Sequence, residues 1–362
     1  MNIIYTHNIF TAQKYGGVSR YFFEIIKRVI LAEVDVQVIA GFYINEYVRY
    51  LPRVKGFCVP SINHTGAIRQ KISEAYQRYM LRRSGDDAIV HQTYYSKSCI
   101  KFCGKSVVTV YDMVHELFPQ SFPENDDTSR DKRLCCERAD QIIAISHSTK
   151  NDLVRLFSID PEKINVIHLG SSMKEITASR SNSFFSEPYL LFVGTRSGYK
   201  NFEGLLRAFA ASKHLKDNFH VVCFGGAAFS VNEKESFKEL GIEGLVHQVS
   251  GDDDMLATFY RHAKVFVYPS LYEGFGIPVL EAMSLGCPVV CSKTSSMPEV
   301  AGDAAAYFDP YDIASIQQTL EDTLLNESLI HDLRIKGRIR ESLFSWERCA
   351  QETIDLYHSL LN

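Results

Sequence analysis

Short apolar runs typical of buried strands alternate along most of this chain with longer segments of helical period. Most of these runs are rich in β-branched or aromatic residues, as the buried strands of parallel sheets are. Strands that alternate with helices predict parallel sheets covered by helices on both faces. The expected strands are 2–6, 36–40, 88–91, 106–111, 141–145, 164–167, 189–193, 220–224, 246–249, 265–268 and 288–291.

The chain length sets the number of domains. At 362 residues the chain exceeds one ordinary core, since a domain usually takes about 100 to 200 residues. We therefore expect an α/β protein of two Rossmann-like domains that face each other across a cleft. The segment 170–183 is polar, serine-rich and without apolar period, which favours an interdomain linker. The predicted boundaries are a first domain over 1–172, a linker over 173–187, a second domain over 188–343 and a C-terminal helix over 344–362.

The composition excludes several classes of protein. A hydrophobic share of 46%, a charged share of 23% and a net charge of −4 are typical of a globular protein with no general attraction to nucleic acid. The nine cysteines show no zinc-site spacing, so we expect reduced, mostly packed thiols. The chain begins with a strand instead of a signal peptide, and no stretch is apolar enough to span a bilayer. We expect a cytoplasmic protein.

One strand and the turn after it have the pattern of a ligand site. The apolar run 265–268 ends at a proline, and the turn that follows holds Glu273, Gly274 and Gly276. Pro278 suits the first turn of a helix, so the free amides near Gly276 and Ile277 would lie at a positive helix end that attracts an anion or a hydroxyl-rich ligand.

Two carboxylates flank this helix start. Glu273 can reach a ligand over the helix, and Glu281, one turn inside, can reach the far part of the same ligand. Spacing alone leaves an alternative open: Glu273 is a solvated loop carboxylate and Glu281 is favoured only by the helix dipole.

The segment 268–310 resembles the donor-binding core of the retaining glycosyltransferases of family 4, which have the GT-B fold. The Glu-x7-Glu pattern of Glu273 and Glu281 carries this resemblance. It implies that Glu273 holds hydroxyls of the donor sugar and that Glu281 holds the ribose of the nucleotide. The donor-binding residues implied around them are Gly274, Phe275, Gly276 and Ile277.

A second motif follows the strand 189–193. Gly194 and Gly198 form a turn that would deliver Arg196 and Lys200 to the carboxyl edge of the sheet, where open α/β sheets bind ligands. An arginine and a lysine suit a diphosphate and the negative charge that grows on it as the glycosidic bond breaks. An exposed basic loop is the alternative. The order Gly-Thr-Arg, then Lys-Asn, resembles the family's diphosphate clamp.

The first half carries weaker signals. Gly16 and Gly17 lie at a turn near a helix start, and the pair resembles the family's flexible glycine loop beside the donor phosphate, which makes Gly17 a candidate. Many relatives have His-Asp where this chain has Tyr111 and Asp112. The histidine expected near the donor sugar is thus absent from its usual place, and we consider that His115 takes over its contact, with Asp112 beside it.

Three further features have competing interpretations. Ser146 fits a helix N-cap in a segment that also resembles the family. The acidic run 252–254 is typical of the start of a helix and not of a metal-binding aspartate pair. The basic segment 68–83 is either an amphipathic helix packed on the first domain or a helix that rests on an anionic membrane surface where lipid-linked acceptors lie.

The resemblance implies a retaining transfer of a hexose from a nucleotide diphosphate sugar to a hydroxyl of a growing glycan, without a metal or other cofactor. The sequences of the motifs most resemble those of bacterial O-antigen or capsule mannosyltransferases. This resemblance favours GDP-mannose as donor and lipopolysaccharide O-antigen or a lipid-linked oligosaccharide as acceptor. A peripheral contact with the inner membrane would follow. Two alternatives remain: a sugar-nucleotide epimerase of the same fold, and a non-catalytic partner subunit.

Overall fold

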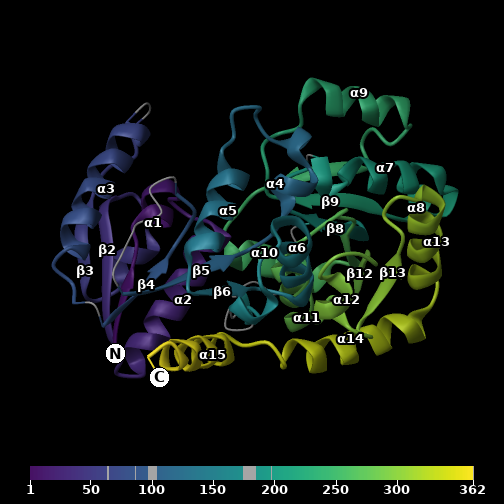
Figure 1. Cartoon of the computed structure of the whole chain (residues 1–362). Coiled ribbons are helices and arrows are strands. Elements are labelled where there is room, and N and C mark those ends of the chain that lie inside the picture. The colour runs from purple at the N-terminus through teal and green to yellow at the C-terminus, as the bar shows by residue number, and fades with distance from the viewer. Residues whose placement is uncertain (63–64, 86, 97–103, 174–184, 197, 362) are drawn as a thin grey trace. The chain divides into compact units, whose positions relative to one another are not determined.

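The computed structural model describes residues 1–62, 65–85, 87–96, 104–173, 185–196 and 198–361 (Figure 1). The chain forms two compact units, each built on its own parallel sheet. The first unit comprises Met1–Leu117, Phe122–Leu169 and Ser345–Asn362, and the second comprises Phe118–Ser121 and Gly170–Phe344. The predicted α/β class is therefore confirmed. Residues 174–184 of the predicted linker lie outside the described residues.

The first unit holds a seven-stranded sheet with the order β3-β2-β1-β4-β5-β6-β7. Its strands are β1 (Asn2–Tyr5), β2 (Asp35–Tyr43), β3 (Val54–Cys58), β4 (Ala88–Gln92), β5 (Lys105–Val110), β6 (Gln141–Ala144) and β7 (Ile164–Val166). Its helices are α1 (Asn8–Ala12), α2 (Gly17–Leu31), α3 (Gly66–Leu81), α4 (Val114–Leu117), α5 (Thr128–Arg138), α6 (His147–Phe157) and α15 (Trp346–Ser359).

The edge strand β3 was missed by the sequence analysis. Its residues are exposed or only half-buried, because the strand has a neighbour on one side alone, so it lacks the continuous apolar run of the central strands. The strand that precedes Tyr111 is consequently the fifth of the chain and not the fourth that the apolar runs suggested.

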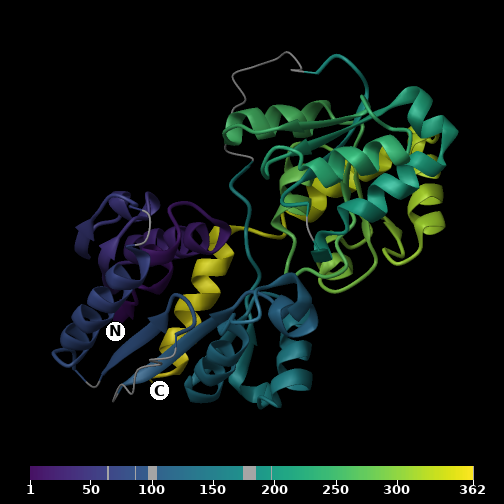
Figure 2. The same ribbon diagram turned by 90° about the horizontal axis from the view of Figure 1, so that it is seen from above.

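The C-terminal helix α15 belongs to the first unit, where it packs against α2 (Figures 1 and 2). The Tyr357 hydroxyl lies 3.0 Å from the Tyr5 hydroxyl and 2.5 Å from Nδ1 of the buried His91. At the surface Arg28 of α2 binds the Glu347 carboxylate at 2.6 Å. Buried hydrogen bonds thus attach α15 to β1 and β4, and an ion pair attaches it to α2.

The second unit holds a six-stranded sheet with the order β10-β9-β8-β11-β12-β13. Its strands are β8 (Tyr189–Val193), β9 (His220–Phe224), β10 (Val246–Val249), β11 (Val265–Tyr268), β12 (Val289–Ser292) and β13 (Ala305–Phe308). Its helices are α7 (Phe202–Ala211), α8 (Lys213–Asn218), α9 (Val231–Glu239), α10 (Asp253–His262), α11 (Ile277–Ser284), α12 (Met297–Ala301), α13 (Ile313–Leu324) and α14 (Glu327–Glu341).

The core of the second unit lies between its sheet and the helices α7 and α13. Phe192 and Val267 contribute from the strands, and Phe209 and Ile316 from the helices. Burial of each such side chain stabilises the unit by about 1.5 to 3 kcal/mol, so the sheet is a firm base for the loops at its carboxyl edge. Of the described cysteines, all seven are free thiols, as predicted. Among the described residues no helix is both long and apolar enough to cross a membrane.

Candidate functional site

The turn between β11 and α11 has the geometry that its glycines and proline predict. Gly276 precedes α11 with φ of 102°, a conformation that side chains other than glycine rarely adopt. A Cβ atom on Gly276 would also lie 2.5 Å from the Met297 methyl group. Pro278 occupies the first turn of α11. The chain can therefore approach a ligand closely at this helix start.

The Glu273 carboxylate and the Lys200 ammonium meet in this turn. Lys200 Nζ lies 2.6 Å from Glu273 Oε1, and their side chains are only 16% and 12% exposed. Burial disfavours the charged lysine, but the Glu273 carboxylate and the nearby Tyr268 and Tyr199 outweigh it and raise the pKa of Lys200 well above its ordinary value. The Lys200 ammonium and the Glu273 carboxylate thus lie side by side just after the carboxyl end of β11.

The loop between β12 and α12 fixes the backbone that carries Glu273. Ser295 Oγ accepts a hydrogen bond from the Glu273 amide at 3.0 Å. Ser296 Oγ, fully buried, lies 2.9 Å from both the Glu273 and the Phe275 carbonyl oxygens. Sequence reasoning missed these two serines, whose signal is a pair of small hydroxyl residues directly after a buried strand.

Tyr268 is a third residue that the sequence analysis read only as part of a strand. Its hydroxyl lies 3.3 Å from Lys200 Nζ, and the lysine also lies over the Tyr268 ring at 5.4 Å. The tyrosine is 2% exposed. It therefore forms the buried wall against which the Lys200 side chain rests.

Glu281 lies inside α11 as predicted, one turn beyond the helix start. Its Oε2 accepts a hydrogen bond from the buried Tyr260 hydroxyl at 3.3 Å. Tyr260 comes from α10, whose N-cap is Asp252 with its side chain on the Met255 amide. The prediction that the acidic run 252–254 starts a helix is confirmed.

Arg196 is bound to the start of α9. Its Nε lies 2.7 Å from Glu233 Oε1, its Nη2 donates to the Ala227 carbonyl at 2.7 Å, and the guanidinium lies over the Phe229 ring at 4.8 Å. Glu233 also completes the capping box of α9 with Ser230. Burial by itself raises the pKa of Glu233, but the hydrogen bonds from Arg196 and Ser230 outweigh it and hold this pKa below its ordinary value. Arg196 thus pairs with Glu233, whereas Lys200 pairs with Glu273.

The glycines of this strand end adopt the conformations that they were expected to supply. Gly194 has φ of 127° and Gly198 has φ of 53°, both in the region that favours glycine. Gly198 opens the 3₁₀ turn Gly198–Lys200, which brings Lys200 back over the sheet edge.

In the first unit, Gly16 is the N-cap residue of α2 and Gly17 its first residue. A Cβ atom on Gly17 would meet no atom within 4 Å, so open space lies beside it.

Ser146 caps α6 through the Thr149 amide, as predicted. The neighbouring Lys150 donates to the Ile164 carbonyl at 2.8 Å.

Asp112 and His115 lie in the turn that follows β5. Asp112 Oδ1 accepts from the Val114 amide at 3.1 Å. The His115 ring stacks on Phe122 with centroids 3.8 Å apart, and its Nε2 lies 3.9 Å from Asp126 Oδ2. Burial, and next the Lys132 charge, lower the pKa of His115. In the described chain His115 Nδ1 is buried without a hydrogen-bond partner.

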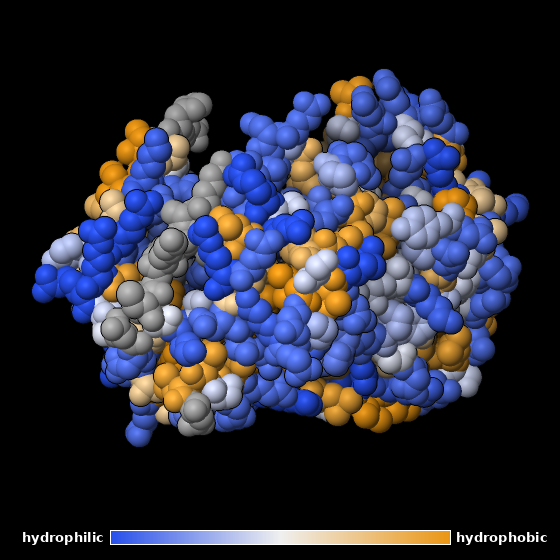
Figure 3. Space-filling view, in the orientation of Figure 1, coloured by the Kyte–Doolittle hydropathy of each residue, from blue (hydrophilic) through white to orange (hydrophobic). Residues whose placement is uncertain are grey.

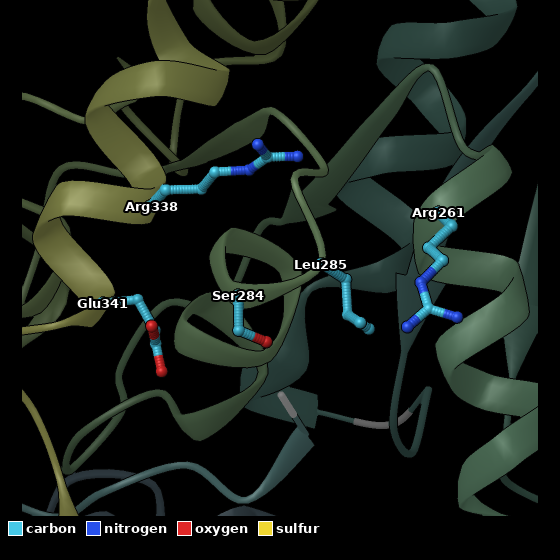
Figure 4. A pocket seen from close by; sticks show the side chains of 5 residues that line it. All are labelled: Arg261, Ser284, Leu285, Arg338 and Glu341. Atoms are coloured by element: carbon cyan, nitrogen blue, oxygen red, sulfur yellow. The ribbon is translucent and has the colours of Figure 1, made fainter. Parts of the chain in front are cut away.

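A separate cavity of about 360 Å³ lies at the opposite end of α11 (Figure 4). It is lined by Arg261, Ser284, Leu285, Arg338 and Glu341. Ser284 ends α11, whereas the Glu273 turn precedes its first residue. The cavity is thus distinct from the Glu273 site.

Comparison with known proteins identifies the family of the chain. The description "Glycosyltransferase Family 4" matches residues 15–173, and "Glycosyl transferases group 1" matches residues 174–340. The two regions follow one another and together cover most of both units. The chain is a family 4 glycosyltransferase.

This family 4 glycosyltransferase is similar along nearly its whole length to a curated relative. O-antigen chain mannosyltransferase B of Escherichia coli is 28% identical over 370 residues, which span 95% of this chain and 96% of the relative.

Two solved structures are similar to this glycosyltransferase in fold. A sucrose-phosphate synthase from Thermosynechococcus elongatus matches with a TM-score of 0.76 at 20% identity and covers 99% of this chain and 98% of its own. The Anabaena protein HepE, solved in complex with UDP and glucose, matches with a TM-score of 0.71 at 16% identity over 99% of both chains. The predicted GT-B fold is confirmed.

Proposed function

We propose that the enzyme is a retaining hexosyltransferase that moves mannose from GDP-mannose to a hydroxyl of a growing surface glycan such as lipopolysaccharide O-antigen. The observation that carries the proposal is the Lys200–Glu273 pair at the start of α11, which offers one charge for a diphosphate and one acceptor for sugar hydroxyls. The similarity to an O-antigen mannosyltransferase supports the choice of sugar and acceptor. That HepE binds UDP supports a nucleotide sugar as donor.

The roles of the second unit follow from the chemistry of its side chains. Glu273 accepts hydrogen bonds from hydroxyls of the donor sugar. Ser295 and Ser296 fix the backbone that carries this carboxylate. Lys200, and Arg196 once it leaves Glu233, neutralise the diphosphate as negative charge develops on the leaving oxygen. Glu281 holds the ribose. The donor-binding backbone is that of Gly194, Gly274, Phe275, Gly276 and Ile277.

The first unit binds the acceptor in this proposal, and its loops also serve the donor. Gly17 provides the open space at the N-terminus of α2 for a phosphate. His115 and Asp112 contact the donor sugar in place of the histidine that Tyr111 replaces. The cationic side chains and the helix start carry the charge of the leaving group, so the reaction requires no divalent cation.

We also propose that the enzyme works in the cytoplasm at the surface of the inner membrane. The α3 helix exposes Ile68, Ile72 and Tyr79, which are 62%, 48% and 55% accessible, beside the exposed Lys71 and Arg82. Figure 3 shows apolar and charged side chains next to one another where α3 lies. Such a surface attracts anionic lipid and would keep the enzyme near lipid-linked acceptors.

The decisive experiment offers the purified enzyme GDP-mannose, UDP-glucose and their parent nucleotides, with and without a lipid-linked oligosaccharide. Mannose transfer that depends on the acceptor and yields an α-linkage from the α-configured donor supports the proposal. An altered nucleotide sugar formed without acceptor would identify an epimerase instead. No turnover with any donor would refute the proposed activity.

A further inference from the structure

The helical turn that carries His115 is too short to be stable on its own. The α4 helix has four residues, in which the Leu117 amide donates to the Met113 carbonyl and the Val114 amide donates to the Asp112 carboxylate. An isolated helical turn is unfavourable in water, because many backbone angles are fixed for few hydrogen bonds.

A buried lysine from another helix binds both ends of this turn. Lys132 of α5 is 1% exposed, and its Nζ lies 2.9 Å from the Asp112 carbonyl oxygen and 2.8 Å from Glu116 Oε2. The same ammonium lies 3.9 Å from Asp112 Oδ1 and 5.6 Å from the Tyr95 ring centre. Lysine is rarely buried to this degree unless it is paired, so these contacts account for its place in the core.

The two contacts lie on opposite sides of His115 in sequence. Asp112 precedes the α4 turn and Glu116 lies within it, so one ammonium group sets the position of the histidine between them. Phe122, stacked on the His115 ring, fixes the orientation of the ring from the other side.

We propose that Lys132 is a positioning residue for sugar transfer: its buried ammonium binds the Asp112 carbonyl and the Glu116 carboxylate and thereby holds His115 in place at the end of β5. The inference rests on the proposed function, because it gives His115 a role at the donor sugar. It adds a residue that touches neither substrate.

The charge on Lys132 also acts on the histidine itself. The charged groups that face His115 are Lys132, Asp112, Asp126 and Glu116, and the pKa of His115 is lowered, first by burial and next by Lys132. Loss of the Lys132 charge should therefore raise this pKa, whereas loss of the Glu116 charge should lower it further. These opposite shifts test whether the two charges face His115, and the change in kcat of a folded variant tests whether the position of His115 matters for transfer.

The experiment measures the titration of His115 by NMR of ring-labelled histidine in the full-length protein, with His115→Gln to assign the signal. We expect a raised pKa in Lys132→Met, a lowered pKa in Glu116→Gln, and a pKa near that of the wild type in Lys132→Arg. In the transfer assay Lys132→Met should reduce kcat about 10- to 100-fold, the effect of a small misplacement in an active site. Lys163→Met is the matched control, since Lys163 in the same unit also donates to a backbone carbonyl, that of Glu137, at an exposed site.

Lys132→Met leaves Glu116 buried without its partner and can fail to fold, so the double variant Lys132→Met/Glu116→Gln removes both charges. This double variant is compared by kcat, because its two effects on the pKa of His115 oppose each other. An unchanged kcat in the folded single or double variant would overturn the proposal, and so would an unchanged His115 pKa in folded Lys132→Met. So would failure of both variants to fold while the control folds, because Lys132 would then be needed for the unit as a whole. If the His115 pKa shifts as expected but the wild type transfers no sugar, the contact between Lys132 and the His115 turn is supported and the proposed function fails.

Discussion

Removal of the negative charge in Glu273→Gln tests the central pair of the donor site. The glutamine keeps the shape and can still accept a hydrogen bond from Lys200, but the ammonium at 2.6 Å loses its counter-charge. Complete burial would make such a loss cost about 3 to 5 kcal/mol. Because the side chains are 12% and 16% exposed, water screens part of the unpaired charge. We therefore expect the free energy of unfolding of the second unit to fall by about 2 to 3 kcal/mol.

A loss of this size lowers the melting temperature by about 4 to 12 °C for a unit of this length but leaves the fold intact. We expect turnover to fall about 10²- to 10³-fold, since Glu273 addresses the reacting sugar, while the affinity for free nucleotide is retained. Differential scanning calorimetry measures the melting temperature, and steady-state transfer assays measure the turnover. Isothermal titration calorimetry with free nucleotide measures the affinity.

The matched control is Glu203→Gln, which breaks an exposed ion pair with Arg207 in the same unit, where both side chains are at least 60% exposed. Its effect on stability should stay within about 0.5 kcal/mol. Near-normal turnover of Glu273→Gln with the predicted loss of stability would show that the pair is structural only. That result would remove Glu273 from the proposed site.

Further predictions concern the cations, the metal requirement and the acid stability. Arg196→Ala should slow transfer about 10²- to 10³-fold, and an equal rise in KM at unchanged kcat would instead mean uniform binding of ground and transition states. Transfer should persist in excess EDTA; its loss, restored by magnesium, would contradict the cation assignment. Burial lowers the pKa of His91 to about 3, so the unfolded chain binds this proton first as the pH falls below about 6.5. The resulting loss of stability, at most about 1.4 kcal/mol per pH unit from this group, should lessen in His91→Gln when urea unfolding is compared between pH 6.5 and 4.

The sequence predicted the central strands and the Glu273 turn because both are local patterns. Continuous apolar runs mark strands covered on both faces, and the Gly276–Pro278 spacing marks a helix start. It missed the edge strands β3 and β13, each of which has a neighbour on one side only and is partly exposed.

The contacts around the candidate site could not be predicted in the same way. The pairing of Arg196 with Glu233, of Lys200 with Glu273 and of Lys132 with Glu116 joins residues from different elements. A sequence lists these charges but gives no distance between them, and only the folded sheet brings each pair together.

The attachment of α15 to the first strand has a consequence for synthesis of the chain. Besides the short segment Phe118–Ser121, the second unit is the continuous stretch Gly170–Phe344, so all of it is translated before α15. The first unit, although translated first, lacks Tyr357 and Trp346 until the end and leaves the apolar face of α2 uncovered during that time. The half of the enzyme that is made first is therefore completed only after the second unit, and a chain that stops before α15 exposes an aggregation-prone surface on the half that was already made.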